Sequence, residues 1–156
     1  MSVEVAVTVD APKRHVWRTV SDIEHAASTI SAIEKIEVLE RPSEGLLGLK
    51  WKETRTLFGK SATETMWVTV ADEHSYYATE ARSHGSIYRT EIHLADQDGG
   101  TRLSMTFSAE AQTLGARVMS TVFGFLMNRS LKKALLQDLQ DLKKAAESRE
   151  APTSVD

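Results

Sequence analysis

The chain has no cysteine among its 156 residues. This absence excludes disulfide bonds, thiolate chemistry, iron–sulfur clusters and cysteine-ligated zinc. An excess of one charge is also missing, because 19 Lys and Arg residues stand against 22 Asp and Glu residues, for a net charge of -3. Without a strong basic excess, we expect neither nucleic acid nor an anionic membrane as a partner.

Long hydrophobic runs are absent as well. The least charged stretch covers 118–127, whereas a membrane-spanning helix needs about 20 apolar residues. We therefore expect no stable membrane insertion. The first residues lack the basic segment and the apolar segment of a signal peptide, so we expect a cytoplasmic protein.

The motifs of common active sites are missing too. There is no Gly-x-Ser-x-Gly elbow, no Gly-x-Gly-x-x-Gly fingerprint and no Walker A loop. The histidines do not have the spacing of metal ligands on a predicted helix. We therefore expect no metal and no cofactor, and we assign no catalytic residue. The histidines are His15, His25, His74, His84 and His93.

The chain does have the composition of a folded domain, with 41% hydrophobic and 26% charged residues. Its length suits one domain. We place this domain at residues 1–147. Small polar residues and Pro152 predict a flexible tail over 148–156.

The hydrophobic pattern predicts both strands and helices. Apolar residues alternate over 3–9, which predicts a strand. Pro12 suits the first turn of a short helix, and a second short helix is predicted over 22–29. From 115 to 147 apolar residues recur every three or four positions, which predicts a long helix. The other predicted strands are 33–40, 49–57, 62–71, 75–82, 86–95 and 101–111.

Short connections between these strands predict an antiparallel meander, because parallel neighbours need longer crossovers. The Gly99-Gly100 pair is the clearest hairpin signal. For the preceding hairpin, matching the apolar faces predicts a four-residue loop over 58–61. This register puts Arg55 directly opposite Glu64.

Strand 75–82 allows two interpretations. In one, Glu80 faces the interior and lies opposite Tyr88. In the other, the competing set that includes Tyr77 and Thr79 faces the interior. The pattern alone leaves both open.

Three charged residues share a face with the apolar residues of their strands. Glu53, Arg55 and Glu64 fall on the side predicted to face inward. Because an unpaired carboxylate is costly to bury in a dry core, we interpret the interior as wet or filled by a ligand. One alternative is that the strand ends splay and expose these charges to solvent. Another is that Arg55 and Glu64 form a cross-strand ion pair that fixes the register, and we favour this interpretation for these two residues.

The long helix is predicted to have two kinds of surface. Asp138, Asp141 and Glu147 balance the neighbouring lysines, which indicates a solvated face. Residues 118–127 are uncharged and apolar on more than one side, so they need a cover. A lid, a ligand or a second subunit would provide it, and a homodimer is therefore one hypothesis.

The order of elements resembles the START-like or Bet v 1-like helix-grip superfamily (SRPBCC), in particular its polyketide cyclase/dehydrase and lipid-transport branch. The resemblance covers about residues 3–147 and implies an α+β fold, in which a curved antiparallel sheet grips the long C-terminal helix around a hydrophobic cavity. Its members include carriers, receptors and cyclases, so the fold alone does not define a function. The matching segments are Asp10-Ala11-Pro12, Val16-Trp17, Ser21-Asp22, Trp51-Lys52-Glu53 and Gly99-Gly100-Thr101-Arg102-Leu103.

Our leading hypothesis is a protein that binds or carries a small hydrophobic or amphipathic molecule, such as a lipid, a polyketide or an aromatic compound. The alternative is a cyclase or dehydratase with Glu53 or Glu64 as base and Arg55 or Tyr88 stabilising an oxyanion, so the sequence leaves open whether the chain is an enzyme. Residues expected to line the cavity are Trp51, Glu53, Arg55, Glu64, Met66, Tyr88, Ile92, Met105, Phe107, Met119, Phe123 and Met127.

Overall fold

A computed structural model describes residues 2–83 and 85–150, without the side chains of 116–127, 149 and 150. The described chain begins with one strand and two short helices, continues with a run of strands and ends in a long helix. The elements are β1 Ser2–Val9, α1 Lys13–Val20, the 3-10 helix η1 Ile23–Ser28, β2 Ile33–Glu40, β3 Lys50–Leu57, β4 Lys60–Asp72, β5 Tyr76–Ser83, β6 Ser86–Gln97, β7 Gly100–Ala111 and α2 Leu114–Glu150.

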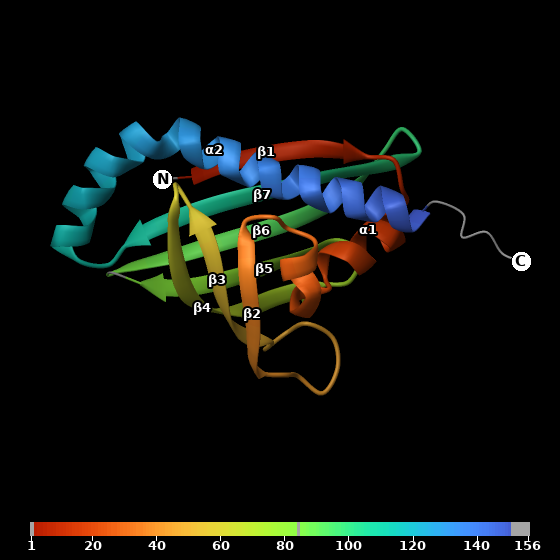
Figure 1. Cartoon of the computed structure of the whole chain (residues 1–156), viewed down its shortest axis with the longest axis horizontal. Helices are drawn as coiled ribbons and strands as arrows, with labels where there is room; N and C mark the ends of the chain where they lie inside the picture. Colours follow the sequence, from red (N-terminus) through yellow and green to blue (C-terminus); the bar gives the residue numbers. More distant parts are fainter. Residues whose placement is uncertain (1, 84, 151–156) are drawn as a thin grey trace, which may run out of the picture.

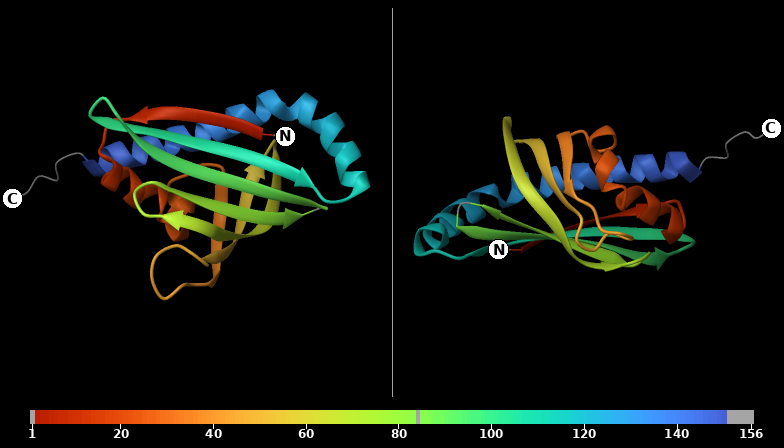
Figure 2. Two further views of the ribbon diagram at one scale, coloured as in Figure 1. Left: turned by 180° about the vertical axis from the view of Figure 1, so that it is seen from behind. Right: turned by 90° about the horizontal axis from the view of Figure 1, so that it is seen from below.

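The strands form one seven-stranded sheet in the order β1-β7-β6-β5-β4-β3-β2. Every neighbouring pair in this order is antiparallel. Helix α2 crosses one face of the sheet and packs against β1, α1 and β7 (Figure 1). The sheet bends around this helix, with α1 and η1 on the same side (Figure 2). The predicted antiparallel sheet around a long C-terminal helix is therefore confirmed.

The hairpin between β3 and β4 is tighter than the sequence predicts. Leu57 pairs with Lys60, so the turn contains only Phe58 and Gly59. Both turn residues have positive φ angles, 53° and 78°, as a type I′ turn requires, and this turn suits the twist of the strands. The predicted four-residue loop was therefore wrong, because the turn is two residues shorter. The shift of two positions leaves each side chain on its predicted face of the sheet but gives each residue a different cross-strand partner.

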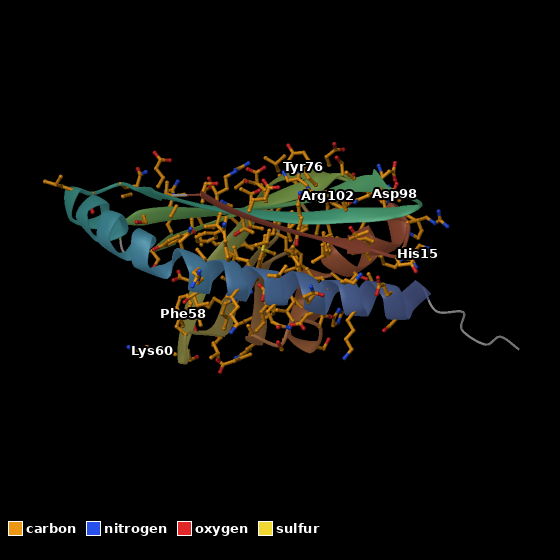
Figure 3. All side chains as sticks on the ribbon, turned by 90° about the horizontal axis from the view of Figure 1, so that it is seen from above. His15, Phe58, Lys60, Tyr76, Asp98 and Arg102 are labelled. Carbon is orange, nitrogen blue, oxygen red and sulfur yellow. The ribbon has the colours of Figure 1, made fainter. Side chains whose placement is uncertain are left out.

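The register of β5 follows the second of the two interpretations. Ala81 pairs with Tyr88, whereas Glu80 pairs with Arg89 on the other face. The alternative in which Glu80 faces the interior is therefore wrong. Tyr76 and Arg102 project from the side of the sheet away from α2 (Figure 3).

The hairpin between β6 and β7 has the predicted register, with Ile92 opposite Met105. Its turn is Asp98-Gly99, which places Gly100 at the first position of β7. A Cβ at Gly100 would clash with the carbonyl oxygen of Val9 on β1. Glycine at this position therefore lets β1 lie close to the start of β7.

The core lies where the second half of α2 meets β1, β7 and α1. Leu139 and Leu103 are fully buried there, beside Val9 and Val16. On α2, the buried positions 135, 139, 142 and 146 recur every three or four residues, as the sequence predicts. The helix continues to Glu150, while 151–156 of the predicted tail lie outside the described residues.

Candidate functional site

A partly enclosed cavity of about 380 Å3 lies between the sheet, α2 and the two short helices. Ligand pockets in proteins range from about 300 to 1,000 Å3, so this space can hold a small molecule. Its wall is mostly apolar. The lining residues are Val20, Ile23, Ala26, Ile30, Ile33, Trp51, Glu53, Arg55, Leu57, Ala62, Glu64, Met66, Tyr77, Thr79, Ala81, Tyr88, Thr90, Ile92, Met105, Phe107, Leu131, Ala134, Leu135, Asp138 and Leu142.

Strand periodicity places these side chains on the wall. The lining positions are every second residue of β3, β4, β5, β6 and β7, because alternate side chains of a strand point to the same face. Tyr88 and Phe107 stack across β6 and β7, with ring centroids 5.9 Å apart. Trp51 is 2% exposed and Met105 is 5% exposed. This arrangement gives the cavity a mostly apolar surface that includes several aromatic rings.

A chain of hydrogen bonds forms the polar part of the wall. The Nη1 of Arg55 donates to Oδ2 of Asp138 at 2.8 Å. The Nε of Arg55 donates to Oε2 of Glu53 at 3.1 Å, and Nε1 of Trp51 donates to Oε1 of Glu53 at 3.3 Å. Arg55 therefore bridges two carboxylates, one on its own strand and one on α2.

The predicted ion pair between Arg55 and Glu64 is absent. In the observed register Arg55 lies opposite Ala62, and Glu64 lies opposite Glu53. Among the described residues, the side chain of Glu64 makes no hydrogen bond or ion pair. The physical reason is the two-residue turn, which moves the pairing by two positions along β4.

The placement of Asp138 on a solvated face was also wrong. Asp138 is 3% exposed and lines the cavity between Leu135 and Leu142. Its distance from these two leucines, three and four positions, is the spacing of one helical face. That spacing was the available signal, but the balance of nearby lysines and carboxylates concealed it.

Burial determines the electrostatics of this cluster. Desolvation raises the pKa of Asp138 above its ordinary value; Arg55 opposes this rise, and the negative charges of Glu53 and Asp141 add to it. Burial alone would lower the pKa of Arg55, but attraction to Asp138 and Glu53 raises it, so the guanidinium stays charged. The second oxygen of Asp138, Oδ1, is buried and has no hydrogen-bond partner among the described residues.

Tyr77 was a candidate only as part of the competing register, and it also lines the cavity. Its hydroxyl donates to the carbonyl oxygen of Val20 at 2.9 Å, and its ring packs edge-on to Trp17. Burial raises the pKa of the Tyr77 hydroxyl, with the negative charge of Glu53 as a second cause. Tyr77 therefore joins β5 to α1 as a neutral hydrogen-bond donor.

The structure brings together nine of the twelve predicted site residues. The other three, Met119, Phe123 and Met127, belong to the predicted cover region 118–127. The structure describes the helical backbone of this region but not its side chains. The nine that line the cavity are Trp51, Glu53, Arg55, Glu64, Met66, Tyr88, Ile92, Met105 and Phe107. The short helix η1 also contributes to the wall, which strand parity alone does not reveal.

Metal ligands do not gather in this site. Within residues 2–83 and 85–150, no group of three or more His, Cys, Asp or Glu side chains is placed to hold a metal ion. Over the same part of the chain, the helices lack the length or the apolar character needed to span a bilayer.

Comparison with known proteins identifies the family. Residues 1–147 match the family described as polyketide cyclase / dehydrase and lipid transport, and the chain belongs to this family. No curated protein sequence matches the chain. The predicted resemblance to the helix-grip superfamily is therefore confirmed over almost the entire sequence.

Solved structures show the same fold at low sequence identity. A protein of Thermus thermophilus superimposes with a TM-score of 0.79 at 16% identity, over 97% of this chain and 100% of that one. The Zhui aromatase/cyclase of a Streptomyces species gives a TM-score of 0.74 at 22% identity, over 99% of each chain. A major latex-like protein of Panax ginseng gives 0.74 at 10% identity, over 94% of this chain and 97% of that one.

Proposed function

We propose that the chain binds or carries a small hydrophobic or amphipathic molecule in the cavity between the sheet and α2. The observation that carries this proposal is a partly enclosed cavity of about 380 Å3 with a mostly apolar wall and one polar cluster. Apolar walls supply affinity by removing ligand surface from water, and a few polar groups orient the bound molecule.

The chemistry of the wall supports an elongated or aromatic ligand. Tyr88 and Phe107 offer stacked ring faces, and Met66 and Met105 offer flexible thioethers that adapt to different shapes. The polar cluster of Glu53, Arg55, Glu64 and Asp138 would face the polar end of such a ligand. The membership of a family that includes lipid transport agrees with this proposal.

Thermal unfolding with a panel of ligands tests the proposal. A ligand that binds only the folded chain stabilises it by about 2.7 kcal/mol at a hundred times its Kd. We expect a concentration-dependent rise in Tm with long-chain lipids or polycyclic aromatic compounds, and a one-to-one adduct by native mass spectrometry. No rise in Tm with any member of the panel, together with an adduct-free mass, would overturn the proposal.

A second candidate is a cyclase or dehydratase, and Glu64 is the observation that favours it. This carboxylate lines the cavity and makes no ion pair or hydrogen bond among the described residues, so it is available as a base. One structural neighbour is named an aromatase/cyclase, and two more are named di-domain ARO/CYC proteins. Conversion of a linear poly-β-ketone to a cyclic product, lost in Glu64→Gln, would support it; unchanged turnover in that variant would remove Glu64 from the mechanism.

A further inference from the structure

The charges on the cavity wall are not balanced. Three carboxylates, those of Glu53, Glu64 and Asp138, line the cavity together with one guanidinium, that of Arg55. Within the described chain, this guanidinium is already paired with two of the carboxylates. Arg55 is therefore compensated before any ligand enters, and the wall as a whole has an excess of negative charge.

Two acceptor groups in this cluster lack donors within the described chain. Asp138 lines the cavity with a side chain that is 4% exposed, and its Oδ1 has no partner. Glu64 lies across the β3–β4 pair from Glu53, where no described cation or donor reaches it. Oδ1 of Asp138 is a buried acceptor without a donor, which is unfavourable, whereas Glu64 is only half-buried. A ligand that supplies a donor to these carboxylates gains affinity at this place.

A ligand carboxylate would meet the opposite situation. It would bring another negative charge next to Glu53, Glu64 and Asp138 in a mostly apolar cavity, where like charges repel more strongly than in bulk water. The only guanidinium on the described wall is shared between Glu53 and Asp138, so it offers little net attraction to an anion. This arrangement argues against Arg55 as a holder of a carboxylate or an enolate.

We propose that the cavity selects ligands whose polar end donates hydrogen bonds and carries no negative charge, namely a hydroxyl or an ammonium group, and that it rejects carboxylates. This inference rests on the proposed binding function and specifies its ligand class. The donor group is bound by Glu64 and Asp138, and the apolar body of the ligand lies against Tyr88, Phe107 and the methionines.

Competition among three ligands with the same apolar body tests this selectivity. The neutral fluorophore N-phenyl-1-naphthylamine is bound to the full chain near pH 7 and displaced by decylamine, decan-1-ol or decanoate. The two ionic ligands are used below their micelle-forming concentrations, and the alcohol is used below its solubility limit. Because a hydrogen bond to a charged acceptor is worth roughly tenfold or more in affinity, we expect the amine and the alcohol to displace the probe at about tenfold lower concentrations than decanoate.

Variants assign the effect to the cavity. Glu64→Gln is expected to narrow the gap between decylamine and decanoate by about tenfold, and Asp138→Asn, whose amide can donate, is expected to shift preference towards decanoate. Glu80→Gln is the matched control, because Glu80 pairs with Arg89 on the outer face and should leave the preference unchanged. Glu64→Gln removes no described ion pair, so it is the variant that should fold without difficulty.

The outcomes separate the two proposals. Displacement by decanoate at concentrations equal to or below those of the amine and the alcohol would overturn the selectivity but leave the binding function intact. Probe binding without displacement by any of the three would overturn the selectivity, whereas no probe binding at all would overturn both. An unchanged preference in both Glu64→Gln and Asp138→Asn would contradict the assignment to these carboxylates.

Discussion

At the scale of single residues, Arg55 holds the polar part of the cavity wall together. It bridges Glu53 on β3 and Asp138 on α2, and so it connects the sheet to the long helix. Removal of one partner from a buried ion pair leaves the other charge uncompensated, which is more costly than the net value of the pair. Arg55 therefore contributes to stability as well as to the electrostatics of the site.

We predict that Arg55→Met lowers the free energy of unfolding by about 3 kcal/mol, because it leaves two carboxylates in a desolvated position without their cation. Urea unfolding followed by circular dichroism measures this loss. Arg102→Met is the control, since Arg102 forms an exposed pair with Glu4 and should change stability by less than about 0.5 kcal/mol. Equal effects of the two substitutions would contradict the buried network.

The raised pKa of Asp138 predicts a pH dependence. Burial makes the carboxyl hold its proton more tightly in the folded chain than in the unfolded chain. Its contribution to stability is therefore present below the unfolded pKa and is lost as pH rises through the folded pKa. We therefore compare the free energies of unfolding of the native chain and of Asp138→Asn at a series of pH values. The difference, native minus variant, should fall as pH rises above about 4. A difference that is constant or rises with pH would contradict this sign.

The residues of the wall were only partly predictable. Strand alternation identified Trp51, Glu53, Arg55 and Glu64 as sharing one face, because parity survives a shift of two positions. It could not identify which residue pairs with Arg55, since the partner lies on a helix 83 positions away in the sequence. Contacts of this kind depend on how the helix crosses the sheet, which no local pattern contains.

At the scale of elements, turns determine the register of the sheet. The Phe58-Gly59 and Asp98-Gly99 turns both use two residues with positive φ, which matches the twist of the strands. The bulge in β4 between Val68 and Val70 shifts its register with β5. Hydrophobic periodicity therefore predicted where the strands lie. It did not predict the length of the β3–β4 turn or the position of the bulge in β4.

Gly100 offers a test at this scale. We predict that Gly100→Ala lowers the free energy of unfolding by roughly 2 kcal/mol, because the new methyl group would overlap the carbonyl of Val9 and push β1 away from β7. Gly115→Ala is the matched control: apart from the adjoining helix backbone, no described atom lies within 4 Å of its added Cβ at the start of α2, and alanine favours helix. Thermal unfolding of both variants measures the difference. A Gly100→Ala protein as stable as Gly115→Ala would contradict the close approach of β1.

At the scale of the whole molecule, the packed core and the cavity share one interior, because core residues such as Leu135 and Leu142 also line the cavity. The second half of α2 packs tightly on β1 and α1 around Leu139 and Leu103. The cavity extends from Leu131 and Ala134 on α2 towards the strands β3 to β7. The core can therefore stabilise the fold while the neighbouring space remains available to a ligand.

A larger side chain in the cavity tests whether the space there is needed for the stability of the fold. We predict that Ala134→Leu leaves the Tm of the ligand-free chain unchanged or higher, because the larger side chain extends into existing space and removes apolar surface from contact with water. Differential scanning calorimetry measures this. A fall in Tm of several degrees would indicate that the space around Ala134 is already filled.

Probe binding to the cavity-filled variant is the most direct test of the account. N-phenyl-1-naphthylamine is titrated into the native chain, Ala134→Leu and the control Ala95→Leu, whose added side chain lies at an exposed position of β6. We predict saturable one-to-one binding to the native chain and to Ala95→Leu, with affinity reduced about tenfold or more in Ala134→Leu. Equal affinity of all three proteins, or no saturable binding to the native chain, would contradict a ligand site between the sheet and α2.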